Sequence, residues 1–243
     1  MGAMIDIHNH TIFGVDDGSK TLEQSKKMLK IAYDEGIRGI VLTPHYNPYR
    51  WLFDISLIEE RFYALKEYCE KDFPKLKLFL GSELYYGKDT LNDLARGMSF
   101  TMADGDYIMV EFSTTVNYKD IRQAVMDIQQ SGYYPILAHV ERYVCLLENA
   151  EYVYELKELG AFIQVNASGV MGEQNKLEKK FIKELLLSEN VDFVATDAHR
   201  DNSRAPYLKK CSDYLVKRYG EEYTKRILRD NPLKVIKNQY IGE

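Results

Sequence analysis

The chain alternates short apolar runs with amphipathic stretches along nearly its whole length, and this alternation limits the folds open to it. Each run has the length and residue types of a buried strand, and the stretch after it carries apolar residues at helical spacing. Seven such units follow one another without a linker rich in proline, glycine or serine. This order predicts parallel strands covered by helices. The runs begin near Met4, Gly39, Leu76, Tyr107, Tyr134, Ala161 and Val191.

A sheet of seven parallel strands can close into a TIM-like barrel or stay open and doubly wound. Polar residues end nearly every predicted strand, as in barrel enzymes, whose sites are built from several strand ends on one face. No G-x-G-x-x-G follows the first strand, so a dinucleotide site has no support. We therefore predict an α/β chain that forms a (β/α)7 TIM-like barrel, in a single domain over residues 4–243. Residues 1–3 resemble a cloning remnant.

Capping patterns predict where several helices begin and end. Residues 21–24 match a capping box, and Ser56 with Glu59 predicts the start of a second helix. A further helix is predicted from Asn149 through Leu159. From Pro206 onward only helices are predicted, with a break at residues 231–232, an Asn-Pro pair.

Charge, apolar runs and cysteine content restrict the kinds of partner this protein can bind and the cellular compartment expected for it. The 32 basic and 37 acidic residues give a formal net charge of −5, which disfavours a nucleic-acid partner because polyphosphates need a basic surface. No apolar run is long enough to span a membrane, and the start lacks the features of a signal peptide. Three widely spaced cysteines without a C-x-x-C are typical of reduced thiols. We expect a cytoplasmic protein without membrane insertion.

All five histidines fall at or just after the C-terminal end of a predicted strand. Three acidic residues occupy the same kind of position, and a fourth lies in the loop after the first strand. Singly, such a histidine is more often a hydrogen-bonded core residue, and such an acid is often a helix N-cap. Jointly, five histidines at one end of one barrel indicate a shared site. The candidates are His8, His10, Asp17, His45, Glu83, Glu111, His139, Asp197 and His199.

Nine candidate ligands are too many for one metal ion. Imidazole and carboxylate ligands without thiolate suit zinc, manganese, iron or magnesium. A carboxylate that bridges two ions roughly 3.5–4 Å apart is the pattern of phosphatases and nucleases. The residues themselves therefore indicate a multinuclear metallohydrolase.

Four motifs resemble those of the PHP (polymerase and histidinol phosphatase) superfamily. They are residues 6–10 (Asp-Ile-His-Asn-His), 43–45 (Thr-Pro-His), 138–139 (Ala-His) and 196–199 (Thr-Asp-Ala-His). The resemblance covers the length of the chain and implies a distorted seven-stranded β/α barrel that holds three divalent metal ions. It implies three ligand sets: His8, His10, Glu83 and Asp197 for one ion; Glu83, Glu111 and His139 for a second; Asp17, His45 and His199 for a third.

Within that superfamily, the chain is similar to the PHP-type protein-tyrosine phosphatases of bacterial capsule and exopolysaccharide loci. The features are residues 5–10 with 16–18, the segment 136–143 and the chain length. The sequence departs from the pattern at Thr196, where serine is expected. The resemblance implies that two arginines, Arg142 and Arg204, assist the phosphate. It also implies a substrate: the tyrosine-rich tail of a membrane-associated autokinase that controls polymer synthesis.

The residues give independent support for phosphoryl chemistry. Arginine presents a planar, bidentate fork to phosphate oxygens, although either arginine could instead form a surface salt bridge.

A cysteine-dependent tyrosine phosphatase needs an arginine six residues after its nucleophile. The residues six positions after Cys69, Cys145 and Cys211 are Lys75, Glu151 and Lys217. We therefore expect a metal-bound hydroxide to attack phosphorus in line with the leaving oxygen, with manganese as the first candidate metal.

Two alternatives remain open. One is another PHP phosphoesterase that acts on a small phosphate such as histidinol phosphate or, against the acidic balance, on nucleic acid 3′ ends. The other is a non-catalytic, metal-bound scaffold, whose ligand set would be incomplete. An aromatic loop could stack on a phosphotyrosine ring or simply pack on its own domain. That loop contains Tyr46, Tyr49, Trp51 and Phe53.

Overall fold

A computed structural model describes residues 2–50, 53–172 and 175–242. It contains the alternating order of strands and helices that the sequence predicts. The strands are β1 Met4–Asn9, β2 Ile37–Leu42, β3 His45–Tyr46, β4 Lys77–Leu80, β5 Glu83–Tyr85, β6 Tyr107–Glu111, β7 Tyr134–Leu137, β8 Phe162–Asn166 and β9 Phe193–Ala195.

Helices connect the strands. The α-helices are α1 Leu22–Asp34, α2 Ile55–Asp72, α3 Thr90–Ala95, α4 Tyr118–Gln130, α5 Val144–Glu148, α6 Glu151–Glu158, α7 Ala167–Val170, α8 Lys176–Leu187, α9 Lys209–Tyr219, α10 Glu221–Lys225 and α11 Asn231–Ile236. The described residues also form two 3₁₀ turns, η1 Met102–Asp104 and η2 Val140–Arg142, and one π-helical turn, η3 Arg226–Asp230. Among the described residues, none of these helices is long and apolar enough to cross a membrane.

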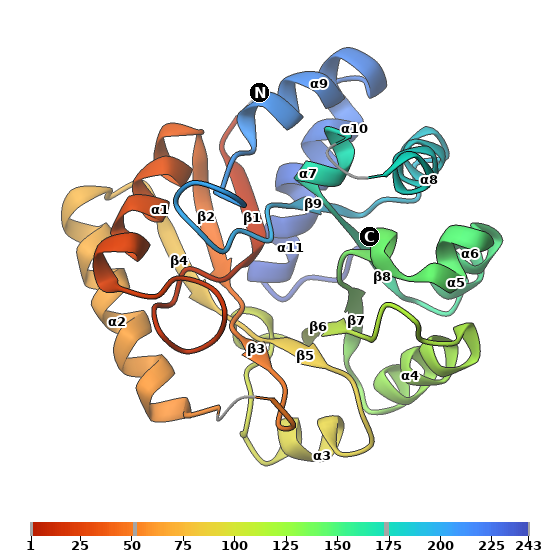
Figure 1. Cartoon of the computed structure of the whole chain (residues 1–243), viewed down its shortest axis with the longest axis horizontal. Coiled ribbons are helices and arrows are strands. Elements are labelled where there is room, and N and C mark those ends of the chain that lie inside the picture. Colours follow the sequence, from red (N-terminus) through yellow and green to blue (C-terminus); the bar gives the residue numbers. More distant parts are fainter. Residues whose placement is uncertain (1, 51–52, 173–174, 243) are drawn as a thin grey trace.

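Among the described residues, all strand pairs are parallel, and the strands form two sheet segments. One segment has the order β1-β2-β4, and the other has the order β3-β5-β6-β7-β8-β9. Residues 43–44 separate β2 from β3, and residues 81–82 separate β4 from β5. Because β3 and β5 follow β2 and β4 directly, the two segments continue one curled sheet. Figure 1 shows this sheet at the centre with helices around it.

The first and last strands meet through a few specific bonds. Asn9 forms an isolated parallel bridge with Ala198, and the backbone N–H of Asp197 donates to the His8 carbonyl at 2.9 Å. The buried Asp6 carboxylate also accepts the Thr196 hydroxyl at 2.5 Å. The predicted parallel sheet with outer helices is thus confirmed, and the sheet curls. The structure shows no regular ladder between β1 and β9 in the described residues, so complete barrel closure stays a prediction.

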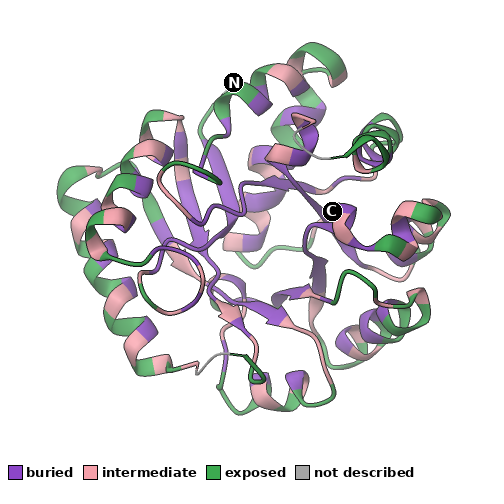
Figure 2. Cartoon of the chain, in the orientation of Figure 1, coloured by how far each residue is buried: buried purple, intermediate pink, exposed green. Residues whose placement is uncertain are grey.

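Two apolar layers cover the sheet. The larger layer lies between the sheet and the outer helices, and a smaller cluster includes Ile7, Met109 and Phe193. Met102 of η1 and Val235 of α11 belong to that smaller cluster. Figure 2 shows the buried sheet in purple and the exposed outer faces of the helices in green.

Local helix boundaries differ from the predictions in three places. The second helix begins at Ile55 because Asp54, not Ser56, accepts the Leu57 N–H at 3.1 Å. The helix predicted from Asn149 instead begins at Glu151, and α5 precedes it. No break occurs at residues 231–232, since the π-helical turn precedes α11 directly. The wider turn accommodates a proline, which lacks an N–H and crowds the preceding turn.

The cap assignment predicts a difference between two neighbouring substitutions. Asp54→Ala removes the side-chain acceptor at the N-terminus of α2 and should lower the free energy of unfolding by about 0.5–2 kcal/mol. Ser56→Ala is the matched control, because Ser56 is exposed within the helix and alanine is the better helix former. Urea unfolding of both variants measures the difference. If Ser56→Ala lowered the free energy of unfolding more than Asp54→Ala did, Ser56 would be the N-cap instead.

Candidate metal centre

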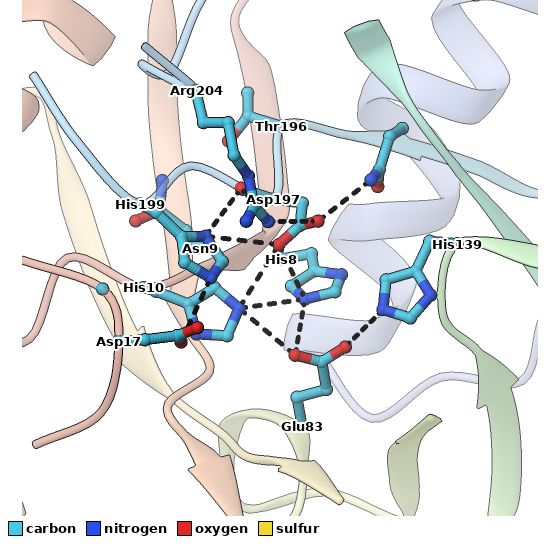
Figure 3. A network of polar contacts seen from close by, with 12 residues as sticks. His8, Asn9, His10, Asp17, Glu83, His139, Thr196, Asp197, His199 and Arg204 are labelled. Atoms are coloured by element: carbon cyan, nitrogen blue, oxygen red, sulfur yellow. Dashed lines mark hydrogen bonds and ion pairs between the residues drawn. The ribbon is translucent and has the colours of Figure 1, made fainter. Parts of the chain in front are cut away.

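The nine candidate side chains come together at or just beyond the C-terminal ends of the strands. Figure 3 shows the part of this cluster around His8, Glu83 and Asp197. Each lies within 3.7 Å of another member of the set, measured between ring nitrogens and carboxylate oxygens. His8 lies in β1, where the pairing register with β2 shifts between Asp6 and Asn9. Such irregularities re-aim side chains next to active sites. The structure therefore gathers the whole predicted set; their role as ligands stays a proposal.

Glu83 lies at the centre of this cluster and is fully buried. Its Oε2 lies 3.1 Å from His8 Nε2, 3.2 Å from His10 Nε2 and 3.0 Å from His45 Nδ1. Its Oε1 lies 2.7 Å from His139 Nε2. Burial alone would raise the pKa of Glu83, but the imidazoles, His8 foremost, outweigh burial and hold this pKa well below its usual value. Glu83 is therefore an ionised carboxylate in contact with four imidazoles.

Oε1 of Glu83 forms a hydrogen bond with His139 Nε2, but the spacing around Glu83 Oε2 and Asp17 Oδ1 fits bound metal ions better than direct hydrogen bonds. Oε2 of Glu83 is buried and forms no hydrogen bond of acceptable geometry, although three nitrogens surround it. Asp17 Oδ1 is also without a hydrogen bond, at 3.4 Å from His45 Nε2 and 3.5 Å from His199 Nε2. Two ligands that hold one ion at about 2.1 Å in tetrahedral geometry lie about 3.4 Å apart. The donor set thus fits divalent ions.

Four overlapping groups of three residues could each hold an ion. Each group has its ligand atoms within 4.8 Å of one another. His8, His10, His45 and Glu83 each belong to two groups, so the geometry alone does not divide the cluster into the three sets that the resemblance implies. The groups are His10, His45, His199; His8, His10, Asp197; His8, Glu83, His139; and His45, Glu83, Glu111.

Hydrogen bonds on the far side of three imidazoles aim one nitrogen of each ring into the cluster. Nδ1 of His8 lies 3.1 Å from Gln164 Oε1, and Nδ1 of His10 lies 2.9 Å from Asp16 Oδ2. Nδ1 of His199 lies 2.9 Å from the Asp197 carbonyl. Each acceptor fixes the proton on Nδ1, which leaves Nε2 free to ligate a metal.

Two of these histidines have opposite protonation preferences. Burial and the nearby His45 lower the pKa of His10, but Asp16, Asp197 and Glu83 outweigh them and raise it to about 10. Burial, followed by the charge of His10, lowers the pKa of His199 to about 4. Without metal, His10 is therefore protonated at neutral pH and His199 is neutral.

A tight loop after β1 carries Asp16 and Asp17. The buried Asp16 accepts the N–H groups of Gly18 at 2.7 Å and His45 at 3.1 Å. A Cβ on Gly18 would lie 2.2 Å from the His10 carbonyl oxygen, so this close approach requires glycine. The Arg200 guanidinium donates to the carbonyls of Asp17 and Gly18. These bonds fix the loop over the cluster.

Asp197 connects the cluster to both predicted arginines. Its Oδ1 faces His8 at 3.6 Å and His10 at 3.5 Å, whereas its Oδ2 accepts Arg142 Nη2 at 2.6 Å and Arg204 Nη2 at 2.7 Å. Asn166 Nδ2 donates to the same Oδ2 at 2.9 Å. The structure thus places both arginines beside the cluster.

Three residues of this region have left-handed backbone conformations. His139 has a φ of 35°, Asp197 of 51° and Arg204 of 52°. Such conformations are costly for residues other than glycine and cluster at functional sites. The surrounding hydrogen bonds therefore hold these side chains in place at the expense of local backbone strain.

None of the cysteines is placed to act as a nucleophile. Cys69 and Cys211 are buried, and burial raises the pKa of Cys69 to about 12. Burial also raises the pKa of Cys145. The thiolate is the nucleophilic form, so these shifts agree with the exclusion of cysteine-dependent catalysis.

The aromatic loop packs largely on its own chain. Tyr46 is buried and its hydroxyl donates to Asp93 at 2.7 Å, and Phe53 packs edge-on against Tyr46. Tyr49 is exposed, and Trp51 lies outside the described residues. Stacking on a substrate ring by Tyr46 or Phe53 is therefore not supported, since internal contacts occupy both.

The residues that orient the cluster were not among those that the sequence patterns indicated. Gln164 and Asn166 lie at alternate positions of β8, and their side chains bond to each other at 2.9 Å. Polar residues at period-two spacing within an apolar strand were the available signal. Asp16, one residue before a predicted ligand, had no signal of its own, because its acceptor role depends on loop geometry.

Comparison with known proteins gives one family over nearly the whole chain. Residues 4–237 match the family described as capsular polysaccharide synthesis, CpsB/CapC. The chain is 36% identical over 243 residues to the tyrosine-protein phosphatase CpsB of Streptococcus pneumoniae, covering 98% of this chain and 100% of that protein. It is 31% identical over 238 residues to the tyrosine-protein phosphatase YwqE of Bacillus subtilis, covering 98% and 93%.

Comparison with solved structures gives the same kind of protein as the comparison of sequences. A structure from the study of YwqE from B. subtilis and CpsB from S. pneumoniae, described as unique metal-dependent tyrosine phosphatases, superposes with a TM-score of 0.90 at 31% identity. It covers 98% of this chain and 96% of that one. A histidinol phosphate phosphatase from Lactococcus lactis gives a TM-score of 0.62 at 16% identity, covering 90% and 95%, a likeness that shows the fold alone.

The raised pKa of His10 predicts how metal loading depends on pH. A metal at His10 Nε2 must displace a proton that is bound up to about pH 10, so binding should release protons and the apparent affinity should increase as the pH rises from 6 to 8. Titration calorimetry of the metal-free protein with manganese, in buffers of different ionisation enthalpy, counts the protons released. Manganese binding that releases no protons, with an affinity that does not change with pH, would contradict the assignment of His10 as a ligand that is protonated before the metal binds.

Proposed function

The chain belongs to the CpsB/CapC family of capsular polysaccharide synthesis proteins, and from this premise we propose that it is a metal-dependent protein-tyrosine phosphatase. The observation that supports this best is the buried Glu83 carboxylate among four imidazoles, beside two arginines that share one carboxylate oxygen. The high coverage of relatives that are tyrosine-protein phosphatases supports the substrate class.

We propose that the nine clustered side chains would hold the divalent ions. Eight of them belong to the four possible ligand groups, and Glu83 belongs to two of these groups. The ninth, Asp17, lies 3.4 Å from His45 Nε2. Bound ions of this kind supply an activated water at neutral pH and positive charge for the phosphoryl oxygens. Three ions, with manganese first and zinc, iron or magnesium as alternatives, are our proposal for number and identity. Gln164 and Asp16 fix the proton of His8 and of His10 on Nδ1, so Nε2 of each ring is already oriented for metal binding.

The arginines act on the phosphoryl group in this proposal. Arg142 and Arg204 donate to Asp197 Oδ2 and present their remaining N–H groups beside the cluster. Burial lowers the pKa of Arg142, but the Asp197 carboxylate outweighs burial and raises it, so this guanidinium stays charged at every pH of interest. Charged forks stabilise the phosphoryl oxygens as their charge changes during transfer.

We further propose that the substrate is a tyrosine-phosphorylated protein, specifically the tail of an autokinase that controls capsule or exopolysaccharide synthesis. The family description supports the pathway, and the substrate class of the relatives supports phosphotyrosine. We also propose that the curled sheet is a distorted, closed (β/α)7 barrel, which the bonds between β1 and residues 196–198 support.

The test is phosphate release from a phosphotyrosyl peptide, histidinol phosphate and a 3′-phosphorylated oligonucleotide. Release should be fastest from the peptide, should stop after exhaustive chelation and should return with manganese. Glu83→Gln should lose both activity and bound metal, because a neutral amide replaces the shared carboxylate. Preferential hydrolysis of histidinol phosphate would favour the small-substrate alternative. Metal binding without hydrolysis of any substrate would favour the scaffold.

A second prediction separates phosphate binding from metal binding. Arg142→Ala should keep the metal content and lower kcat/KM on the phosphotyrosyl peptide by about a hundred- to a thousandfold, the usual loss for one stabilising donor. Arg142→Lys should recover part of this loss, because it keeps the charge without the bidentate fork. Arg122→Ala, an exposed arginine of α4, is the matched control. Near-normal turnover in Arg142→Ala would show that Arg142 only forms an ion pair with Asp197 and does not act on the phosphoryl group.

A further inference from the structure

A cavity of about 590 Å³ opens directly beside the metal cluster. Arg142, Asp197 and Arg204 form part of its wall, so it shares residues with the proposed phosphate site. Its volume falls within the roughly 300–1,000 Å³ of typical ligand sites. Of the other cavities described, none includes a member of the nine-residue cluster or either arginine.

The wall beyond the arginines has a polar part, which includes Ser168 and Lys210, and an apolar part. Met171, Ala205 and Tyr207 form the apolar part, with Tyr207 in the loop that follows Arg204. Tyr207 is 54% exposed, which leaves much of its side chain accessible to a ligand. Glu35 lies on the same wall, but its carboxylate already accepts the N–H groups of Leu208 and Lys209 at 3.0 and 2.8 Å. This contact anchors the start of α9, and with it the segment that carries Tyr207.

The relative positions of these groups restrict what the cavity can hold. Asp197 turns Oδ1 toward the histidines and Oδ2 toward the two arginines. A phosphoryl group in contact with both arginines would therefore adjoin the part of the cavity wall that Arg142 and Arg204 form. The group attached to that phosphoryl oxygen must leave through open space, and the cavity is the described space that adjoins both arginines.

We propose that this cavity is the leaving-group subsite, in which the ring of a phosphotyrosyl side chain lies against Tyr207 and Met171. The inference rests on the proposed phosphatase function and adds the residues that select an aryl leaving group. An aromatic ring gains both apolar burial and an aromatic contact there, whereas a small alkyl phosphate leaves the wall unfilled. Tyr207 is a specificity residue here and has no role in metal binding.

The experiment uses the metal-loaded full chain and two aryl substrates, a phosphotyrosyl peptide and phenyl phosphate. Tyr207→Ala should lower kcat/KM on both by about 2- to 12-fold, the range expected for loss of one aromatic contact. Tyr207→Phe should keep near-normal values because the ring remains. Met171→Ala should lower kcat/KM in the same direction. The inhibition constant for inorganic phosphate, which has no leaving group, should stay unchanged in all variants.

Tyr63→Ala is the matched control, since Tyr63 is 60% exposed on α2 and does not line this cavity. Unchanged kcat/KM in both Tyr207→Ala and Met171→Ala would overturn the subsite. A weaker inhibition by inorganic phosphate in Tyr207→Ala would also overturn it, because the residue would then act on the phosphate itself. If the unaltered protein hydrolyses neither aryl phosphate, the proposed function fails first, and the two failures are thereby distinguished.

Discussion

The structure depends on the burial of two ionised carboxylates, Glu83 and Asp197, beneath the ends of the strands. An isolated buried carboxylate is costly, so each needs positive charge close by. Imidazoles surround Glu83, and two guanidinium groups contact Asp197. Without metal, protonated histidines supply part of that charge. Divalent ions supply it when bound, which couples metal binding to the stability of the site.

The fold makes this concentration of charge attainable. Parallel strands end on one face, so residues distant in sequence meet there without long loops. His8 and Gln164 are 156 positions apart, yet they share a hydrogen bond. The Asp197 carboxylate lies between two groups of side chains. Its Oδ1 faces the histidines, and its Oδ2 accepts hydrogen bonds from the arginines beside the cavity. In the proposed function, this one side chain would link metal binding to phosphate recognition.

The sequence alone was enough for the strand order, the outer helices and the membership of the cluster. Those properties follow from local patterns: apolar periodicity defines the elements, and polar residues at strand ends mark the face where a site forms. His45, Glu111 and His139 were all found in this way. Local patterns were less reliable at helix ends, where Asp54 rather than Ser56 caps α2, because either residue could serve and only backbone geometry decides.

Tertiary structure alone decided how the cluster is oriented and what adjoins it. Asp16, Gln164 and Asn166 act through hydrogen bonds whose partners depend on loop conformation and strand register. The position of Arg204 depends on a left-handed turn, and that of Tyr207 on the docking of α9 against Glu35. The sequence determined which groups are available for chemistry. The three-dimensional fold determined which of their atoms face one another, because hydrogen-bond direction and cavity shape arise only when distant segments pack together.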